Sequence, residues 1–118
     1  MYNALFIGWG TPVRGRETQA SKVFGEWVEL LGAHQTKGTV KSFQPVFIQA
    51  RGGDLQGFFL IQGETNKLHT FLDSEEVRRA TTRAQLIVDN FGVCLALTGD
   101  EIGKQMQLFQ SNATELSK

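Results

Sequence analysis

The sequence is poor in cysteine and histidine, and this scarcity excludes several kinds of site. A single cysteine, Cys94, rules out an internal disulfide and favours a reducing compartment. Because Cys94 lies among apolar residues, we interpret it as a small core residue. One cysteine and two isolated histidines give no metal-ligand spacing. The glycines flanking Trp9 lack the third glycine of a dinucleotide-binding fingerprint, so we expect neither a metal nor a cofactor.

The chain also lacks an excess of charge of one sign and a long apolar run. Its 12 basic and 12 acidic residues balance, whereas proteins that bind nucleic acid or anionic membranes normally carry a basic excess. No stretch approaches the roughly 20 apolar residues of a membrane helix. The N-terminus lacks the basic segment and apolar run of a secretory signal. We therefore expect a cytoplasmic protein that binds neither nucleic acid nor a membrane.

What is present is the composition of one globular domain. The 118 residues are 41% hydrophobic and 20% charged, which suits a chain with one hydrophobic core. No repeat, low-complexity segment or linker divides the sequence. We therefore treat residues 1–118 as a single domain.

The first half of the chain predicts a strand, a helix and a hairpin. Residues 4–9 are a short apolar run, and residues 16–34 carry apolar side chains at helical spacing. Residues 40–50 and 57–62 predict two further strands. The Gly-Gly turn at residues 51–54 makes these two strands antiparallel neighbours.

The second half predicts an interrupted helix, a strand and a last helix. Residues 66–88 are helical in pattern, and the Asp73 and Glu76 pair has capping-box spacing that restarts the helix. Residues 91–97 predict the fourth strand. Thr98 and Glu101 repeat the capping spacing before an apolar stripe formed by Ile102, Met106 and Phe109.

This order of elements predicts the α+β class. The order is βαββαβ followed by a C-terminal helix, which is typical of the ferredoxin-like fold with a four-stranded, mainly antiparallel sheet.

The predicted strands are apolar on both sides, which indicates a second subunit. A sheet with one solvated face alternates apolar and polar residues, and three of the four strands do not. We expect Phe6, Phe58 and Leu60 on the face away from the helices. That face measures roughly 300 Å² when drawn flat, so something must cover it. A second copy is the simplest cover, and the C-terminal helix of the same chain is the alternative.

With this order and this sheet, the chain resembles the dimeric α+β barrel superfamily. That superfamily includes YCII-related proteins, stress-responsive barrel proteins and antibiotic-biosynthesis monooxygenases. The resemblance rests on residues 51–54, the following GFFLIQGE segment, the helix with Leu68, Phe71 and Leu72, and the restart at residues 73–76. It implies two sheets packed face to face and a ligand pocket between sheet and helices. The His-Asp pair of YCII-type proteins and the strand-three tryptophan of haem-degrading members are missing, so no activity carries over.

The RNA-recognition motif shares the same order of elements and is the competing resemblance. RNA stacking needs aromatic residues at alternate positions of strand three, after a basic residue. Gln56, Phe58 and Leu60 stand at those positions. The second aromatic residue and the leading cation are both missing, which argues against an RNA-binding protein.

Five residues are candidates for a small-molecule site. Asn3 and Trp9 lie at the two ends of strand one and share a side, so they either reach solvent or line a cavity. Trp27 on the first helix would add an apolar wall. Arg83 would hold an anionic group, and His69 is the candidate for acid–base catalysis. A structural His69, an Arg83 on a solvated helix face and a core Trp27 are the alternatives.

Two kinds of function follow from these candidates. The first is a homodimeric barrel that binds or transforms a small hydrophobic molecule; as an enzyme it would be a cofactor-independent oxygenase or isomerase. The second is a dimeric interaction module without a pocket. A cavity between sheet and helices distinguishes the first from the second.

Overall fold

The computed structural model describes all 118 residues and contains four strands and four helices. In chain order the elements are β1 (Ala4–Trp9), α1 (Glu17–Lys37), β2 (Ser42–Phe47), β3 (Gly57–Gln62), α2 (Thr65–Asp73), α3 (Glu75–Gln85), β4 (Gly92–Ala96) and α4 (Asp100–Leu116). This is the predicted order. The second and fourth strands are shorter than their apolar runs indicated, and α1 extends further.

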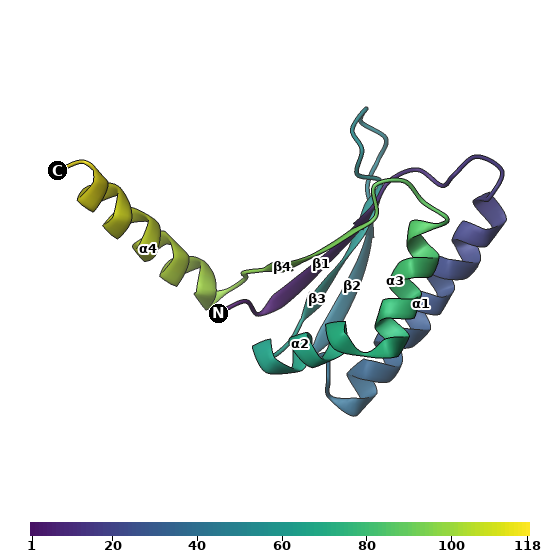
Figure 1. Cartoon of the computed structure of the whole chain (residues 1–118), viewed down its shortest axis with the longest axis horizontal. Coiled ribbons are helices and arrows are strands. Elements are labelled where there is room, and N and C mark those ends of the chain that lie inside the picture. The colour runs from purple at the N-terminus through teal and green to yellow at the C-terminus, as the bar shows by residue number, and fades with distance from the viewer.

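The four strands form one fully antiparallel sheet in the order β2-β3-β1-β4. Helices α1, α2 and α3 lie on one face of this sheet, and its other face is open (Figure 1). The ferredoxin-like α+β fold predicted from the sequence is confirmed. No helix in the structure is both long and apolar enough to cross a membrane.

The hydrophobic core lies between the sheet and the three covering helices. In the β1–β3 register Leu5 pairs with Ile61, and Ile7 pairs with Phe59. These four side chains point toward the helices and are almost completely buried. The helices contribute large apolar residues at i, i+3 or i, i+4 spacing, which places them on one face toward the sheet. Those that are buried in the core include Val23, Trp27, Leu31, Leu68 and Phe71.

The break between α2 and α3 is capped by a different residue from the one predicted. Ser74, not Asp73, has the extended backbone of an N-cap, and its hydroxyl accepts from the Val77 N–H at 3.3 Å. Glu76 instead lies 2.6 Å from His34 Nε2, in a contact that joins α3 to α1. Both serine and aspartate are good N-cap residues. Because Asp73 and Ser74 are adjacent, the predicted N-cap was displaced by one residue.

The open face of the sheet carries the apolar residues that alternate with the core residues. Phe6 pairs with Leu60 in the register, and the Phe6 and Phe58 rings stack with centroids 5.2 Å apart. These three residues belong neither to the core nor to its partly buried margin. Cys94 pairs with Phe6 and is exposed, so its interpretation as a core residue was wrong. The apolar run of β4 concealed which side of the strand faced the helices.

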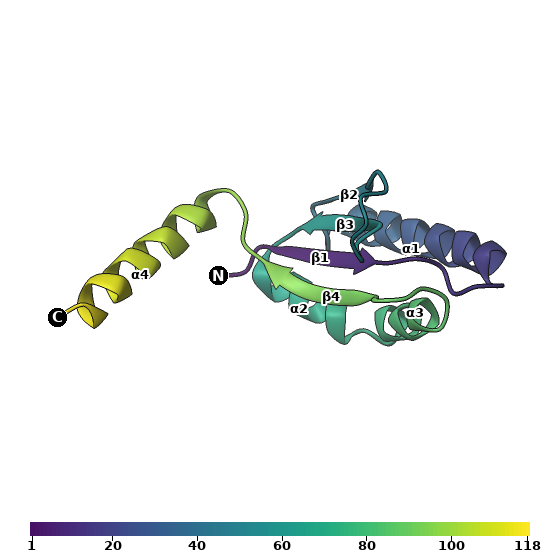
Figure 2. The same ribbon diagram turned by 90° about the horizontal axis from the view of Figure 1, so that it is seen from above.

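Helix α4 leaves the end of β4 and extends away from the rest of the molecule (Figure 2). None of its residues is buried, and no other helix or strand packs against it. The alternative in which this helix covers its own sheet is therefore excluded by the structure. The predicted Thr98 cap was also wrong, because Gly99 is the N-cap residue and no side chain caps the helix. The Thr98 hydroxyl bonds instead to Asn3 and Gln62.

Candidate functional site

A cavity of about 630 Å³ lies between the sheet and the helices, beside the C-terminal end of β1. Its walls come from the first half of α1, the end of α3 with the segment that follows it, and the adjoining ends of β2 and β3. Its size falls within the range of small-molecule sites, about 300–1,000 Å³. The pocket that distinguishes the two predicted kinds of function is therefore present.

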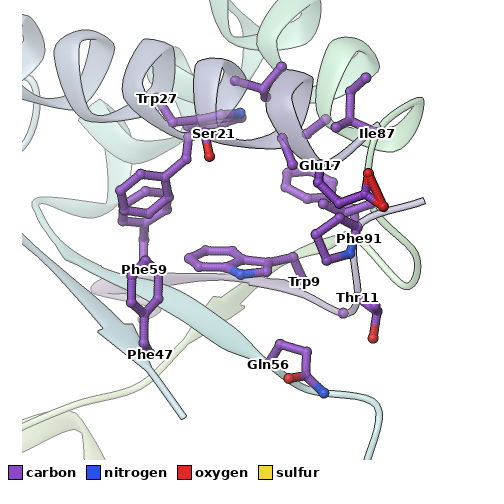
Figure 3. A pocket seen from close by; sticks show the side chains of 17 residues that line it. Trp9, Thr11, Glu17, Ser21, Trp27, Phe47, Gln56, Phe59, Ile87 and Phe91 are labelled. Atoms are coloured by element: carbon purple, nitrogen blue, oxygen red, sulfur yellow. The ribbon is translucent and has the colours of Figure 1, made fainter. Parts of the chain in front are cut away.

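Six aromatic rings line the cavity. Around Trp9, the ring centroid of Phe59 lies 5.1 Å away and that of Phe24 lies 5.9 Å away. Figure 3 shows the Trp9 indole crossing the cavity between Phe59 and Phe47 on one side and Phe91 on the other. Such rings offer flat apolar surfaces that pack against another aromatic ring. The aromatic lining residues are Trp9, Phe24, Trp27, Phe47, Phe59 and Phe91.

Glycine on the neighbouring strand makes room for the Trp9 ring. Gly57 pairs with Trp9 in the β1–β3 register. A Cβ atom at position 57 would lie 2.7 Å from Trp9 Cζ2 and 2.8 Å from the Val46 carbonyl oxygen. Both distances are shorter than van der Waals contact, so a larger residue would displace the indole or the strand. Glycine at this position is therefore a local reason for the orientation of the indole.

Four polar side chains, those of Thr11, Glu17, Ser21 and Gln56, accompany the aromatic wall. Glu17 accepts a hydrogen bond from the Gly15 N–H at 3.0 Å, and this bond lowers the pKa of its carboxyl group below the usual value. Glu17 is therefore ionised at neutral pH and is the only ionisable side chain in the lining. The half-buried Trp9 adds an indole N–H that forms no hydrogen bond within the chain and is open to solvent or a ligand.

Of the five predicted site residues, the structure brings two tryptophans together at this cavity. Trp9 and Trp27 both line it, and the Phe59 ring lies between them, with centroids 5.1 Å and 6.4 Å away. The Trp27 indole N–H donates to the Ala80 carbonyl at 3.3 Å. Trp27 is therefore both a core residue and a wall of the cavity, and only the Trp9 N–H remains available to a ligand.

Asn3 lies at the other end of β1 and does not reach the cavity. Its side-chain amide donates to the Thr98 carbonyl at 2.9 Å, and its Oδ1 accepts from the Thr98 N–H at 2.9 Å. This reciprocal pair holds the segment between β4 and α4 against the start of β1. A strand of this length separates the two ends by about 20 Å, so one small ligand cannot contact both Asn3 and Trp9.

His69 and Arg83 also lie outside the cavity lining. His69 is exposed on α2 and forms no hydrogen bond through its side chain. Arg83 makes a two-pronged ion pair with Glu26 of α1, with both N–O distances at 2.9 Å. Helix phase alone did not reveal that Arg83 faces another helix, because its partner is 57 residues away in the sequence.

Sequence reasoning missed the phenylalanines of the wall. Phe24 was predicted only as part of the helix over residues 16–34, and Phe47 and Phe91 were treated as ordinary strand residues. Phe47 is the last residue of β2 and Phe91 directly precedes β4, whereas Phe24 lies in the first half of α1. The density of phenylalanine, nine in 118 residues, was the available signal, but it does not show which rings converge.

No protein-family model and no curated protein sequence matches the chain. Solved structures do match. A dabb family protein with a ferredoxin-like fold from Mesorhizobium loti has a TM-score of 0.64 at 12% identity, over 84% of this chain and 99% of that one. A dimeric protein of unknown function with a ferredoxin-like fold from Bacteroides fragilis has a TM-score of 0.58 at 8% identity, over 83% and 100%.

A third match is a candidate antibiotic biosynthesis monooxygenase from Deinococcus radiodurans. Its TM-score is 0.59 at 14% identity, over 85% of this chain and 94% of that one. Identities this low show a shared fold and no shared activity. The predicted resemblance is confirmed at the level of the fold: this chain has a ferredoxin-like fold, as do the matching proteins from Mesorhizobium loti and Bacteroides fragilis.

Proposed function

We propose that the protein binds a neutral aromatic small molecule in the cavity beside Trp9. The observation that carries this proposal is an aromatic-lined cavity of about 630 Å³ in which the Trp9 N–H forms no hydrogen bond within the chain. Apolar walls with a small number of placed polar groups are the usual composition of a ligand site. A ligand with a carbonyl or hydroxyl oxygen beside its rings would satisfy that N–H.

The lining favours a neutral ligand over an anion. It contains no Arg, Lys or His, and its one ionised group is the Glu17 carboxylate. An anion entering this cavity would lose its hydration without gaining a cationic partner. Arg83, which the sequence suggested for this task, is already paired with Glu26. Because Glu17 has a lowered pKa, it is also a weak base, which supports binding rather than proton transfer.

Intrinsic fluorescence offers a direct test of binding. Trp9 and Trp27 are the only tryptophans in the chain, and both line the cavity. A titration with N-phenyl-1-naphthylamine, a neutral dye that fluoresces in apolar surroundings, should quench tryptophan emission while dye emission rises. Absence of both changes in the folded protein would contradict the proposal.

Two phenylalanines of one strand provide a matched pair of variants. Phe47 lines the cavity and is 73% exposed, so Phe47→Ala removes a wall at little cost in stability. Phe43 packs against the core and does not line the cavity. Loss of one aromatic contact should weaken dye binding about three- to tenfold in Phe47→Ala. Phe43→Ala should bind dye normally, although it loses more stability.

Matched ligands test the role of the Trp9 N–H. 1-Acetonaphthone carries a carbonyl acceptor, and 1-ethylnaphthalene has a similar size without one. Trp9→Phe keeps a ring but removes the donor, so it should weaken displacement of the dye by 1-acetonaphthone about two- to tenfold. Displacement by 1-ethylnaphthalene should change much less. Equal losses for both compounds would show that the N–H makes no specific contact.

We also propose that the protein is a homodimer that pairs its open sheet faces through Phe6, Phe58 and Leu60. The stacked rings on that face support the proposal, as does the dimeric state of the Bacteroides fragilis protein with this fold. Light scattering from the eluting peak should give about twice the 13.1 kDa mass of the chain. A monomer at micromolar concentration would contradict the dimer but leave the ligand proposal standing.

A further inference from the structure

Helix α4 carries a continuous apolar stripe that nothing in its own chain covers. The stripe residues follow the spacing i, i+4, i+7, i+11 and i+14, which keeps them within one face of a helix. Along this stripe the exposed fraction is 49% at Ile102, 51% at Met106 and 66% at Phe109. The stripe consists of Ile102, Met106, Phe109, Ala113 and Leu116.

The direction of α4 is fixed where it joins the sheet. Asn3 bonds both the N–H and the carbonyl of Thr98 at 2.9 Å, and the Thr98 hydroxyl lies 2.8 Å from Gln62 Oε1. Gly99 then turns the chain with φ 59° and ψ −130°, a conformation that side chains other than hydrogen disfavour. Glu101 accepts from the Met1 amino group at 3.0 Å. These contacts anchor the base of α4 and direct the helix away from its own sheet, as Figure 1 shows.

A helix of 17 residues in this position needs a partner. Most helical stability in proteins comes from packing of an apolar face rather than from the intrinsic propensity of the helix. Water hydrates the polar side of α4, but the side chains of the apolar stripe are not removed from water by any contact within the chain. We infer that α4 is an exchange arm whose stripe packs against a second copy of this chain.

The interface area supports a second copy as the occupant. A stable protein–protein interface buries about 800 Å² on each partner, whereas the open sheet face supplies roughly 300 Å² when drawn flat. One side of a helix about 25 Å long and 10 Å wide adds about 250 Å². In a two-fold dimer each subunit both donates an arm and receives one. A receiving surface of about the same size as the arm then brings the total to about 800 Å² on each subunit, the area of a stable interface.

The charge of α4 disfavours a membrane surface as the occupant. Within the helix, Asp100, Glu101 and Glu115 outnumber the single basic residue, Lys104. Amphipathic helices that bind anionic lipid are instead rich in Lys and Arg on the polar side. The arm also begins at β4, the edge strand next to the proposed dimer face. A second copy seated on that face therefore lies next to the start of the arm.

Two neighbouring residues of the full-length chain provide the test. Phe109 lies on the stripe, and Leu108 is similarly exposed, at 57%, but points to another side of the helix. Sedimentation equilibrium should give Phe109→Lys a dimer dissociation constant at least about tenfold higher than that of the wild type. Leu108→Lys should remain within about twofold of the wild type. Equal behaviour of the two variants would overturn the inference.

Photocrosslinking identifies the chain that the arm contacts. Replacement of Phe109 by p-benzoylphenylalanine keeps an aromatic ring, and irradiation should yield a covalent dimer of isotopically light and heavy chains. The same replacement at Leu108 should yield little. Crosslinks confined to one chain, or none at position 109, would overturn the arm exchange. The inference rests on the proposed dimer. A monomeric wild-type protein would contradict both the dimer and the exchange arm. A dimer that Phe109→Lys does not weaken would contradict only the exchange arm.

Discussion

The two faces of the sheet are built from alternate residues of the same strands but are completed in different ways. On β3, Phe59 and Ile61 point toward the helices and are buried within the chain, whereas Phe58 and Leu60 point to the open face. The covered face leaves one aromatic cavity where sheet and helix diverge. The side of the sheet on which an apolar strand residue lies therefore determines whether it packs in the core, lines a ligand site or contacts a partner. Substitutions on one face at a time should therefore separate these roles.

The largest effect should come from a charge on the open face. Leu60→Arg would place an unpaired cation between two sheets, and burial of such a charge costs several kcal/mol. We expect light scattering to show a monomer or unfolded chain. His69→Arg adds the same group at an exposed position of α2 and should leave the mass unchanged. An intact dimer of Leu60→Arg would show that this face is not the interface.

The neighbouring residue on the covered face should behave differently. Ile61 is completely buried, so Ile61→Ala should lower the free energy of unfolding by about 2–5 kcal/mol through lost contacts and a cavity. Urea denaturation at a fixed protein concentration measures this loss. The folded variant should keep the wild-type mass in light scattering. A loss of dimer without a loss of stability would reverse the assignment of the two faces.

Asn3 and Trp9 provide a comparison of the two ends of β1. Asn3→Ala would leave the Thr98 N–H and carbonyl without their partner, which should cost about 1–3 kcal/mol in urea denaturation. Dye affinity at the Trp9 cavity should stay the same, because Asn3 does not line it. A weaker affinity for N-phenyl-1-naphthylamine in this variant would instead place Asn3 in the ligand site.

The smallest effect should come from the ion pair between α1 and α3. Arg83 and Glu26 are each more than a third exposed, and pairs in such positions contribute about 0.2–1 kcal/mol. Arg83→Ala should therefore lower stability slightly, and less in high salt. Its affinity for the neutral dye should equal that of the wild type. A requirement for Arg83 in ligand binding would contradict its structural role.

The sequence was sufficient for the fold because each element has its own periodic pattern. Leu5 and Ile7 on one side of β1 and Phe6 on the other could be assigned from alternation once the helices were located. The site was harder, because it depends on contacts between distant elements. The pairing of Arg83 with Glu26 and of Asn3 with Thr98 joins residues 57 and 95 positions apart, and no local pattern encodes such distances.

Helix α4 shows a second reason for the same difficulty. Its apolar stripe was visible in the spacing of Ile102, Met106 and Phe109, but a stripe shows only that a helix has a partner. The partner depends on the direction of the helix, which the Thr98 and Gly99 junction sets through contacts with β1. Amphipathic pattern predicted the helix, and tertiary contacts decided where it points.

The central claim is that the covered face ends in a binding site for a neutral aromatic molecule. A crystal structure of the protein with 1-acetonaphthone tests this claim most directly. We expect the naphthalene rings against Trp9 and Phe24, with the carbonyl oxygen about 2.7–3.2 Å from Trp9 Nε1. Ligand bound only elsewhere on the protein, or a cavity that stays closed to saturating ligand, would contradict the claim.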